Sequence, residues 1–172
     1  MLNFKDITLQ DRDTITGYTQ SSNRRNCDLS FSNLCCWRFL YDTQFAEIGG
    51  FIVFKFWAHN KLAYMMPVGQ GNLKKVIKLM VKDAKKEGEP FVMLGVSSEM
   101  REELEEIMPH TFAYTIERNY ADYIYLKENL ANLPGRKFQQ KRNFVNRFLK
   151  AHNDYEVVPI PTPEHTEACS YF

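Results

Sequence analysis

The sequence has few of the features that mark secreted, membrane-spanning or metal-dependent proteins. Its cysteines are at positions 27, 35, 36 and 169, and no two of them form a Cys-x-x-Cys pair. The histidines are scattered, so no cluster of Cys, His, Asp or Glu has the spacing of metal ligands. The sequence therefore predicts no metal site and mostly buried, reduced thiols, which favour the cytoplasm as the location.

Long hydrophobic runs and a strong excess of charge are also missing. No apolar run approaches the roughly 18 residues that a membrane-spanning helix needs, and the polar amino-terminal stretch NFKDITLQDRD is not a signal-peptide pattern. The 22 basic and 21 acidic residues give a net charge of +1, so we expect no stable binding to DNA and no general affinity for polyanions. With 44% hydrophobic residues, the chain has enough apolar surface to build a core.

Hydrophobic periodicity predicts an α/β (α+β) domain, a mixed and mostly antiparallel sheet flanked by helices. The expected order is one strand, two helices, three strands, a helix, a strand, a helix and two strands. The ranges are a strand and helix within 4–18, a buried helix at 30–43, strands at 44–49, 51–57 and 62–68, a helix at 73–87 ended by Gly88, a strand at 91–97, a helix at 98–108 capped by Ser97 or Ser98, and two strands within 112–126.

The segments after Leu126 are predicted to lie outside this domain. The connector ENLANLPG contains a Pro-Gly break, and the basic stretch GRKFQQKRNFVNRFL predicts another helix. YEVVPI then predicts a new strand, and PTPEHTEACSYF predicts the start of a helix that the chain does not finish. One strand and part of a helix do not make a domain by themselves.

This order of elements resembles the GNAT acyltransferase fold. The segments CDLSFSNLCCWR, PVGQGNL, ADYIYLKENLANLPGRKFQQKRNFVNRF and YEVVPI resemble, more specifically, an uncharacterised bacterial family related to the C-terminal domain of phosphatidylglycerol lysyltransferase. That resemblance implies two tandem GNAT-like halves. Residues 1–130 would be the first half, 131–152 a linker with a basic amphipathic helix, and 153–172 the first strand and partial helix of a second, truncated half.

The resemblance also implies an acyl- or aminoacyl-transferase that transfers the acyl group from acyl-CoA or aminoacyl-tRNA to an amine or hydroxyl acceptor, so that a small molecule or an aminoacyl-tRNA would be its substrate. We expect this fragment to be inactive without the second half, which would follow in cis if the reading frame continues beyond Phe172. The rival hypothesis is a non-catalytic binding module whose basic helix contacts an anionic partner, either RNA or an anionic lipid head group.

The loop Gly69, Gln70, Gly71 and Asn72 lies where the resemblance places the acyl-CoA pyrophosphate. Glycines at a helix N-terminus let an anion approach the backbone N–H groups, yet MMPVGQGN has no basic residue before its glycines. The alternative is a plain turn and helix start, and the sequence leaves both open.

Helical phasing of the basic stretch places Lys141 among the apolar residues Phe138, Val145, Phe148 and Leu149, with Arg142 at their border. A lysine inside an apolar stripe either reaches water, forms an ion pair, or binds a ligand. In the third case Lys141, Arg142 and the neighbouring Asn143 would hold a phosphate or carboxylate.

No catalytic residue can be named from the sequence. The tyrosines at 114, 120, 123 and 125 alternate as packing residues of strands do, and nothing selects one of them as a general acid. The acidic residues of 98–108 and the lysines of 73–88 are interpreted as solvated helix faces.

Overall fold

The computed structural model describes residues 2–22, 24, 26–121, 123–160, 162, 167 and 169. These residues form two compact units, Met1–Tyr114 and Thr115–Phe172.

The first unit is built on an antiparallel sheet in the order β1-β2-β3-β4, with β5 paired to β3. Its strands are β1 Lys5–Asp6, β2 Gln44–Ile48, β3 Phe51–Ala58, β4 Lys61–Tyr64 and β5 Val68–Gly69. The turn residues His59 and Asn60 both have positive φ, as a two-residue hairpin turn requires. The predicted meander of three strands is therefore confirmed.

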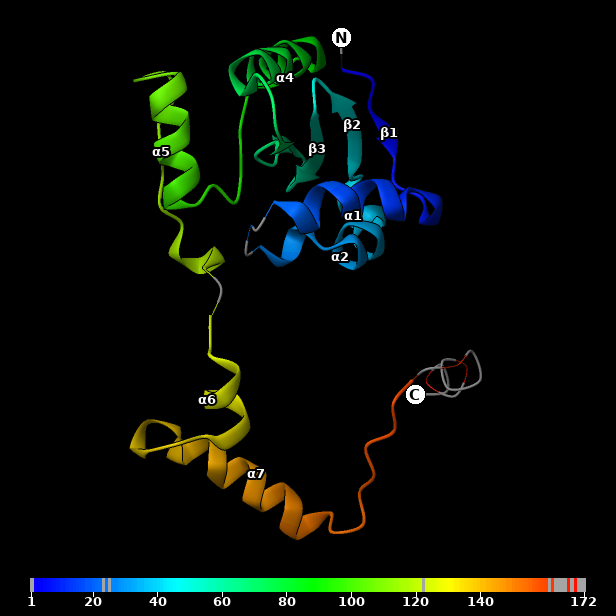
Figure 1. Ribbon diagram of the computed structural model, residues 1–172, viewed down its shortest axis with the longest axis vertical. Coiled ribbons are helices and arrows are strands. Elements are labelled where there is room, and N and C mark those ends of the chain that lie inside the picture. The colour runs from blue at the N-terminus through cyan, green and yellow to red at the C-terminus, as the bar shows by residue number, and fades with distance from the viewer. Residues whose placement is uncertain are drawn as a thin grey trace. The chain divides into compact units, whose positions relative to one another are not determined.

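Alternation along β3 divides the core into two layers. Phe51 and Val53 belong to one buried cluster, while Ile52 and Phe54 belong to the other, because successive side chains of a strand point to opposite faces. The first face packs on α4 (Leu73–Glu87) and the second on α1 (Arg12–Ser21) and α2 (Phe31–Cys36). Figure 1 shows α4 on one side of the strands and α1 and α2 on the other.

The helices of this unit begin and end at residues that the sequence marks. Asn72 caps α4 by accepting from the Lys75 N–H, and Gly88 ends α4 in the left-handed conformation. Ser97 accepts from the Met100 N–H and so caps α5 (Ser98–Ile107). The remaining helical elements are the short η1 (Leu9–Asp11), η2 (Cys27–Leu29) and α3 (Arg38–Tyr41).

Two predictions for the first unit are wrong in part. The predicted buried helix at 30–43 breaks at Trp37 into α2 and α3, and the large side chains of Trp37, Phe39 and Leu40 are exposed. The predicted central strand at 91–97 pairs with the sheet only through the parallel bridge Tyr64–Met93. Val92 and Leu94 are partly exposed, since a segment at the sheet edge lacks a neighbour on its outer side.

The second unit contains η3 (Arg118–Tyr120), α6 (Lys127–Asn132), η4 (Arg136–Phe138) and α7 (Gln139–Ala151). The predicted basic helix is thus confirmed as α7. The two strands predicted within 112–126 and the strand predicted at 155–160 are not formed by the described residues of those segments. Ile116, Ile124 and Val157 are instead largely exposed, because alternating apolar residues form a strand only when a partner strand accepts their hydrogen bonds. The helix predicted at the end of the chain lies mostly outside the described residues.

The predicted fold class is confirmed: a mixed, mostly antiparallel sheet with helices on both faces, consistent with a GNAT-like fold. Within the described part of the chain, no helix is both long enough and apolar enough to cross a bilayer.

Candidate functional site

A β-bulge separates β4 from β5 on the same edge of β3. Tyr64 pairs with Lys55, and Val68 pairs with Ile52. The segment between Tyr64 and Val68 is therefore one residue longer than the segment of β3 between Ile52 and Lys55. The extra residue falls in the segment Met65–Met66–Pro67, which contains a proline that cannot donate to the ladder. Bulges turn backbone groups away from the ladder and are common beside active sites.

The Met66 backbone is the group that the bulge turns away. The Met65 N–H still donates to the Phe54 carbonyl at 3.1 Å, whereas the Met66 N–H has no backbone partner among the described residues. Met66 is only 2% exposed. A buried N–H without a partner is rare in folded proteins, so this group is a candidate donor to a ligand.

The parallel bridge at Tyr64 fixes where the bulge lies relative to residues 92–95. The Tyr64 N–H donates to the Val92 carbonyl at 2.9 Å, and the Leu94 N–H donates to the Tyr64 carbonyl at 3.0 Å. Beyond this bridge the two segments pair no further. They line a recess that also receives residues from the α1–α2 connection and α5; its lining is Arg24, Asn26, Leu29, Met65, Met66, Leu94, Gly95 and Met100.

Arg24 provides the positive charge of this recess. Its Nη1 donates to the Met66 carbonyl at 3.0 Å, directly at the bulge. Partial burial lowers the pKa of the Arg24 guanidinium, while Glu103 opposes that shift, and arginine stays charged in any case. Sequence reasoning missed Arg24, because the stretch SSNRRNCD has the composition of an ordinary polar loop. Only long-range pairing brings it to the bulge.

The glycines of the predicted phosphate loop have a structural role. Gly69 and Gly71 both have positive φ, and a Cβ on either would clash with the carbonyl oxygens of Gly50 and Gly49. The Gln70 N–H donates to the Gly50 carbonyl at 3.1 Å. The glycines therefore let this loop pack against the β2–β3 turn.

The N-terminus of α4 is partly satisfied by its own cap, since the Lys75 N–H donates to Asn72 Oδ1 at 3.0 Å. These contacts explain the sequence Gly-Gln-Gly-Asn without a ligand. Phosphate binding by residues 69–72 stays a prediction.

The basic residues predicted to bind an anion lie on α7 in the second unit. Arg142 is half-buried and donates through Nη1 to the carbonyls of Leu133 and Gly135, the latter at 2.7 Å. It thereby closes the turn after α6, where Leu133 has positive φ. The Lys141 ammonium lies 5.7 Å from the centre of the Tyr125 ring, and Asn143 is exposed.

The apolar face that surrounds Lys141 is not covered within the second unit. Phe138 is buried, but Val145, Phe148 and Leu149 are more than two-fifths exposed. The predicted amphipathic pattern is therefore present, whereas the expected burial is not found among the described residues. Anion binding by Lys141, Arg142 and Asn143 stays a prediction.

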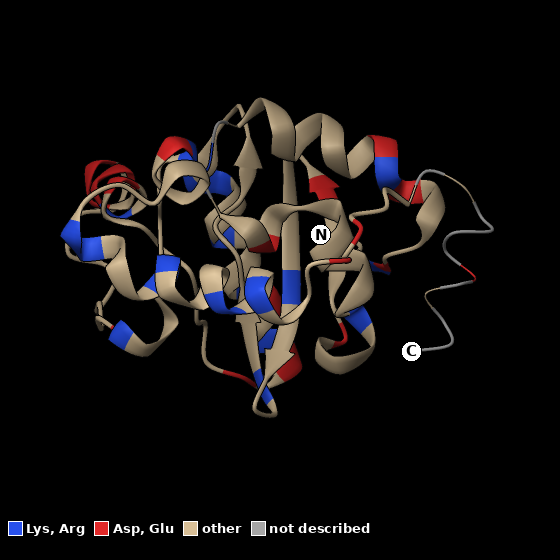
Figure 2. Cartoon of the chain, turned by 90° about the horizontal axis from the view of Figure 1, so that it is seen from below, with Lys and Arg blue, Asp and Glu red and all other residues tan. Residues whose placement is uncertain are grey.

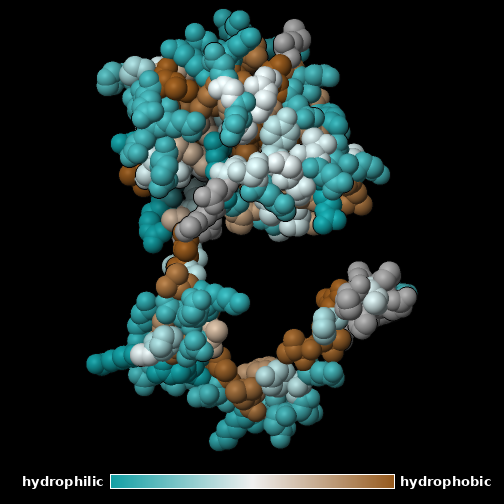
Figure 3. Space-filling model, in the orientation of Figure 1, coloured by the Kyte–Doolittle hydropathy of each residue, from teal (hydrophilic) through white to brown (hydrophobic). Residues whose placement is uncertain are grey.

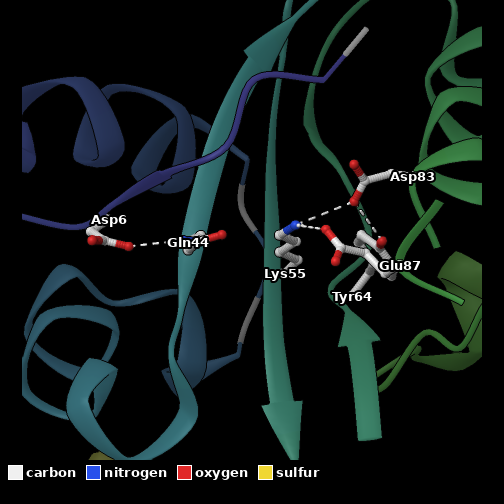
Figure 4. Close-up of polar contacts among 6 residues, drawn as sticks. All are labelled: Asp6, Gln44, Lys55, Tyr64, Asp83 and Glu87. Carbon is white, nitrogen blue, oxygen red and sulfur yellow. Dashed lines mark hydrogen bonds and ion pairs between the residues drawn. The ribbon is translucent and has the colours of Figure 1, made fainter. Parts of the chain in front are cut away.

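A buried polar cluster connects the sheet to α4. The Lys55 ammonium lies 3.0 Å from Glu87 and 3.5 Å from Asp83, and the Tyr64 hydroxyl donates to Asp83 at 2.8 Å (Figure 4). The rings of Phe4 and Trp57 lie near the same ammonium. Burial and the Asp83 carboxylate raise the pKa of Tyr64 strongly. Tyr64 has no solvent exposure, so this cluster fastens α4 to β3 and β4 and does not present a reactive group.

The other candidates do not converge on a site. The Tyr114 phenol lies near Arg101 and Glu105 of α5, and burial raises its pKa. Tyr120 and Tyr123 are mostly exposed. The described residues contain no group of three metal-ligating side chains.

Comparison with known proteins places this geometry in a family. The model of the phosphatidylglycerol lysyltransferase C-terminal family matches residues 19–172. A crystal structure of a conserved protein of unknown function from Bacteroides thetaiotaomicron VPI-5482 is 62% identical, with a TM-score of 0.89 over 98% of this chain. The match covers 57% of that protein's chain, so this chain spans little more than half its length. No curated protein matches. This chain belongs to the phosphatidylglycerol lysyltransferase C-terminal family.

Proposed function

We propose that this chain is the donor-binding half of an acyl- or aminoacyl-transferase, and that the bulge at Met65–Pro67 is where the acyl group of the donor binds. The observation that carries the proposal is the N–H of the buried residue Met66, which has no backbone partner among the described residues and lies beside an arginine and a small recess. Family membership supports the transferase class. The donor is an acyl-CoA or an aminoacyl-tRNA, and the enzyme works in the cytoplasm.

The reaction needs a hydrogen-bonding N–H group beside the carbonyl oxygen of the acyl group. An amine or hydroxyl of the acceptor attacks the acyl carbon, and a new C–N or C–O bond forms. The thioester or ester bond of the donor breaks, and the proton lost by the acceptor passes to the leaving thiolate or alkoxide. Negative charge develops on the carbonyl oxygen as the acceptor adds, and a pre-oriented backbone N–H stabilises that charge. The Met66 N–H supplies this hydrogen bond in our proposal.

Arg24 positions the bulge and adds favourable charge. Its contact with the Met66 carbonyl orients the peptide unit that follows Met66, and the guanidinium has further N–H groups for an anionic part of the donor. The apolar side chains of Leu29, Leu94 and Met100 line the same recess.

A second GNAT-like half completes the enzyme in this proposal. The support is the exposed apolar surface of the second unit, which includes Ile116, Ile124 and the α7 face of Val145, Phe148 and Leu149. Exposed apolar surface of this extent is typical of a surface that another domain covers. The longer chain of the Bacteroides protein is consistent with such a domain. Without it, we expect donor binding but no transfer.

Donor binding tests the proposal. Acetyl-CoA and lysyl-tRNA are titrated separately into the 172-residue chain by calorimetry. Leu94→Trp fills the recess and Arg24→Met removes its charge, and each should weaken binding of the true donor at least about tenfold, the effect of losing about 1.4 kcal/mol of contact.

The matched controls are Leu9→Trp and Arg12→Met, which replace exposed residues of the first unit outside the recess. They should leave the affinity unchanged. The proposal fails if neither donor binds, or if the controls and the recess variants have the same effect.

The alternative is that the chain is a binding module and α7 contacts RNA or an anionic lipid. No contact among the described residues favours it specifically, since Arg142 and Lys141 are engaged with carbonyls and a ring of their own unit. It remains a prediction, and the vesicle experiment below includes it as an outcome.

A further inference from the structure

Helix α4 carries a continuous face of lysines. At about 100° per residue they fall within an arc of about 120° that contains no acidic residue. The members are Lys74, Lys75, Lys78, Lys82, Lys85 and Lys86, and all are exposed. We call this set the α4 lysine face. The helix has 15 residues, so the face runs for about 22 Å.

The α4 lysine face is turned away from the sheet. The opposite side of the helix is buried through Leu73, Val76, Ile77, Met80 and Ala84. In Figure 1 no other element of the first unit lies above the outer side of α4, and Figure 3 shows hydrophilic colouring there. The face is therefore accessible along the length of the helix.

The α4 lysines take no part in the ion pairs of Asp11, Asp83, Glu87 and Glu105. The cationic partners in those ion pairs are Lys5, Lys55 and His110. The acidic residues of α4 itself, Asp83 and Glu87, bind Lys55 on the sheet side.

Like charges four residues apart, such as Lys74, Lys78 and Lys82, weaken a helix by a few tenths of a kcal/mol per pair. The sequence thus keeps a charge pattern that slightly opposes helix stability. A negatively charged partner would relieve this repulsion. Basic residues also lie on other elements (Figure 2), but those of α7 include Lys141 and Arg142, which have partners in their own unit.

We propose that the α4 lysine face docks on the surface of an anionic lipid bilayer. Lysine is a hydrated point charge on a flexible stem, which suits a diffuse layer of negative charge. The face contains no arginine for bidentate phosphate contacts and no aromatic side chain for base stacking. A straight row of lysines therefore fits a flat lipid surface better than a folded RNA.

This inference goes beyond the donor site and does not depend on it. Docking through α4 would bring a lipid acceptor close to a transferase, but vesicle binding is measured without any donor. Failure of one proposal therefore leaves the other standing.

Vesicle flotation with the 172-residue chain tests the docking surface. The vesicles are phosphatidylcholine alone, or phosphatidylcholine with roughly one third phosphatidylglycerol or phosphatidylserine. The α4 variant carries three substitutions: Lys75→Gln, Lys78→Gln and Lys82→Gln. A control removes the same charge from η4 and α7: Lys137→Gln, Arg147→Gln and Lys150→Gln. Glutamine is a good helix former, and circular dichroism checks that both variants retain their helices.

We expect the chain to bind both kinds of anionic vesicle and not phosphatidylcholine. A basic residue near such a surface contributes about fivefold, so the α4 variant should lose roughly 100-fold in partitioning while the control changes less than about threefold. Raising the salt from about 0.1 M to about 0.5 M should release the protein.

Three results would overturn the inference. One is the absence of binding to anionic vesicles at low salt. Another is an equal or larger loss in the α7 control, which would instead support the basic helix as the contact. The third is binding of transfer RNA through the α4 lysines with no vesicle binding, which would make RNA the partner of this face.

Discussion

Replacing Lys55 by methionine should destabilise the first unit much more than replacing an exposed lysine. The Lys55 side chain is 6% exposed and lies between the carboxylates of Asp83 and Glu87, which are 10% and 39% exposed. Removing one partner of a buried ion pair costs about 3–5 kcal/mol, because the other charge stays buried without compensation. The Glu87 carboxylate is exposed enough to be hydrated after Lys55 is removed, so it adds little to this cost. Asp83 keeps the hydrogen bond from Tyr64, so we expect a loss of about 2–3 kcal/mol in the free energy of unfolding.

Urea unfolding followed by tryptophan fluorescence measures this loss. Trp37 and Trp57 both lie in the first unit, so the signal reports that unit alone. The matched control is Lys61→Met on the exposed edge of β4, which should change the free energy of unfolding by less than about 0.5 kcal/mol.

A second substitution separates charge from packing. Asp83→Asn keeps an acceptor for the Tyr64 hydroxyl but removes the negative charge. The double variant Lys55→Met/Asp83→Asn should be no less stable than Lys55→Met alone, because no unpaired charge is left buried. A value for Lys55→Met equal to that of Lys61→Met would refute the assignment of this cluster as the connection between α4 and the sheet.

Three further predictions concern other contacts. The Lys5 ammonium and the Thr8 hydroxyl lower the pKa of Asp11 from 3.8 to about 2. The resulting stabilisation is fully present above about pH 4 and is lost as the pH falls through about 2. Asp11→Asn should therefore cost about 1–2 kcal/mol at pH 7 in urea unfolding and less than about 0.5 kcal/mol at pH 2. A constant difference across that range would contradict it. Gly69→Ala places a Cβ 2.8 Å from the Phe51 Cα at positive φ and should lower the free energy of unfolding by more than about 2 kcal/mol. Gly88→Ala meets no nearby atom and should lower it by about 1 kcal/mol. Equal losses would contradict the packing role of the loop at 69–72. Arg142→Met should speed amide hydrogen exchange in α6 by about tenfold through the loss of its carbonyl contacts, and Arg147→Met should not.

Local signals in the sequence predicted the first unit well. The 3.6-residue period of α4, its Asn72 cap and its Gly88 end are all local, and each appears in the structure. The same holds for the hairpin at His59-Asn60. Patterns of this kind depend on neighbours within a few residues, so no knowledge of distant contacts was needed.

The strands predicted within 112–126 show where a local pattern is insufficient. Tyr123 and Ile124 have the right alternation and side chains, yet no described segment pairs with them. Alternation reports which face a strand could bury, whereas the strand forms only if another strand lies beside it. A similar limit applies to α7. Its apolar stripe was predicted correctly, but the described residues of the second unit do not cover that stripe.

The candidate site was the least predictable part. A bulge depends on the register of β4 and β5 against β3, which no spacing within MMPVGQGN specifies. Arg24 reaches the bulge from 42 residues away in the sequence. The structural role of the glycines at 69 and 71 could not be predicted either. They pack against the Gly49–Gly50 turn, which lies about 20 residues earlier in the sequence.

The most direct test of the account is the response of individual backbone amides to the donor. Two-dimensional nitrogen–proton NMR spectra of the 172-residue chain are recorded during titration with acetyl-CoA and, separately, with lysyl-tRNA. The bulge predicts that the true donor shifts the Met66 amide most, together with those of Leu94 and Gly95, because its carbonyl oxygen accepts from Met66 and its acyl group lies in the recess. Shifts confined to α7, or no response of Met66 to a donor that binds, would contradict it.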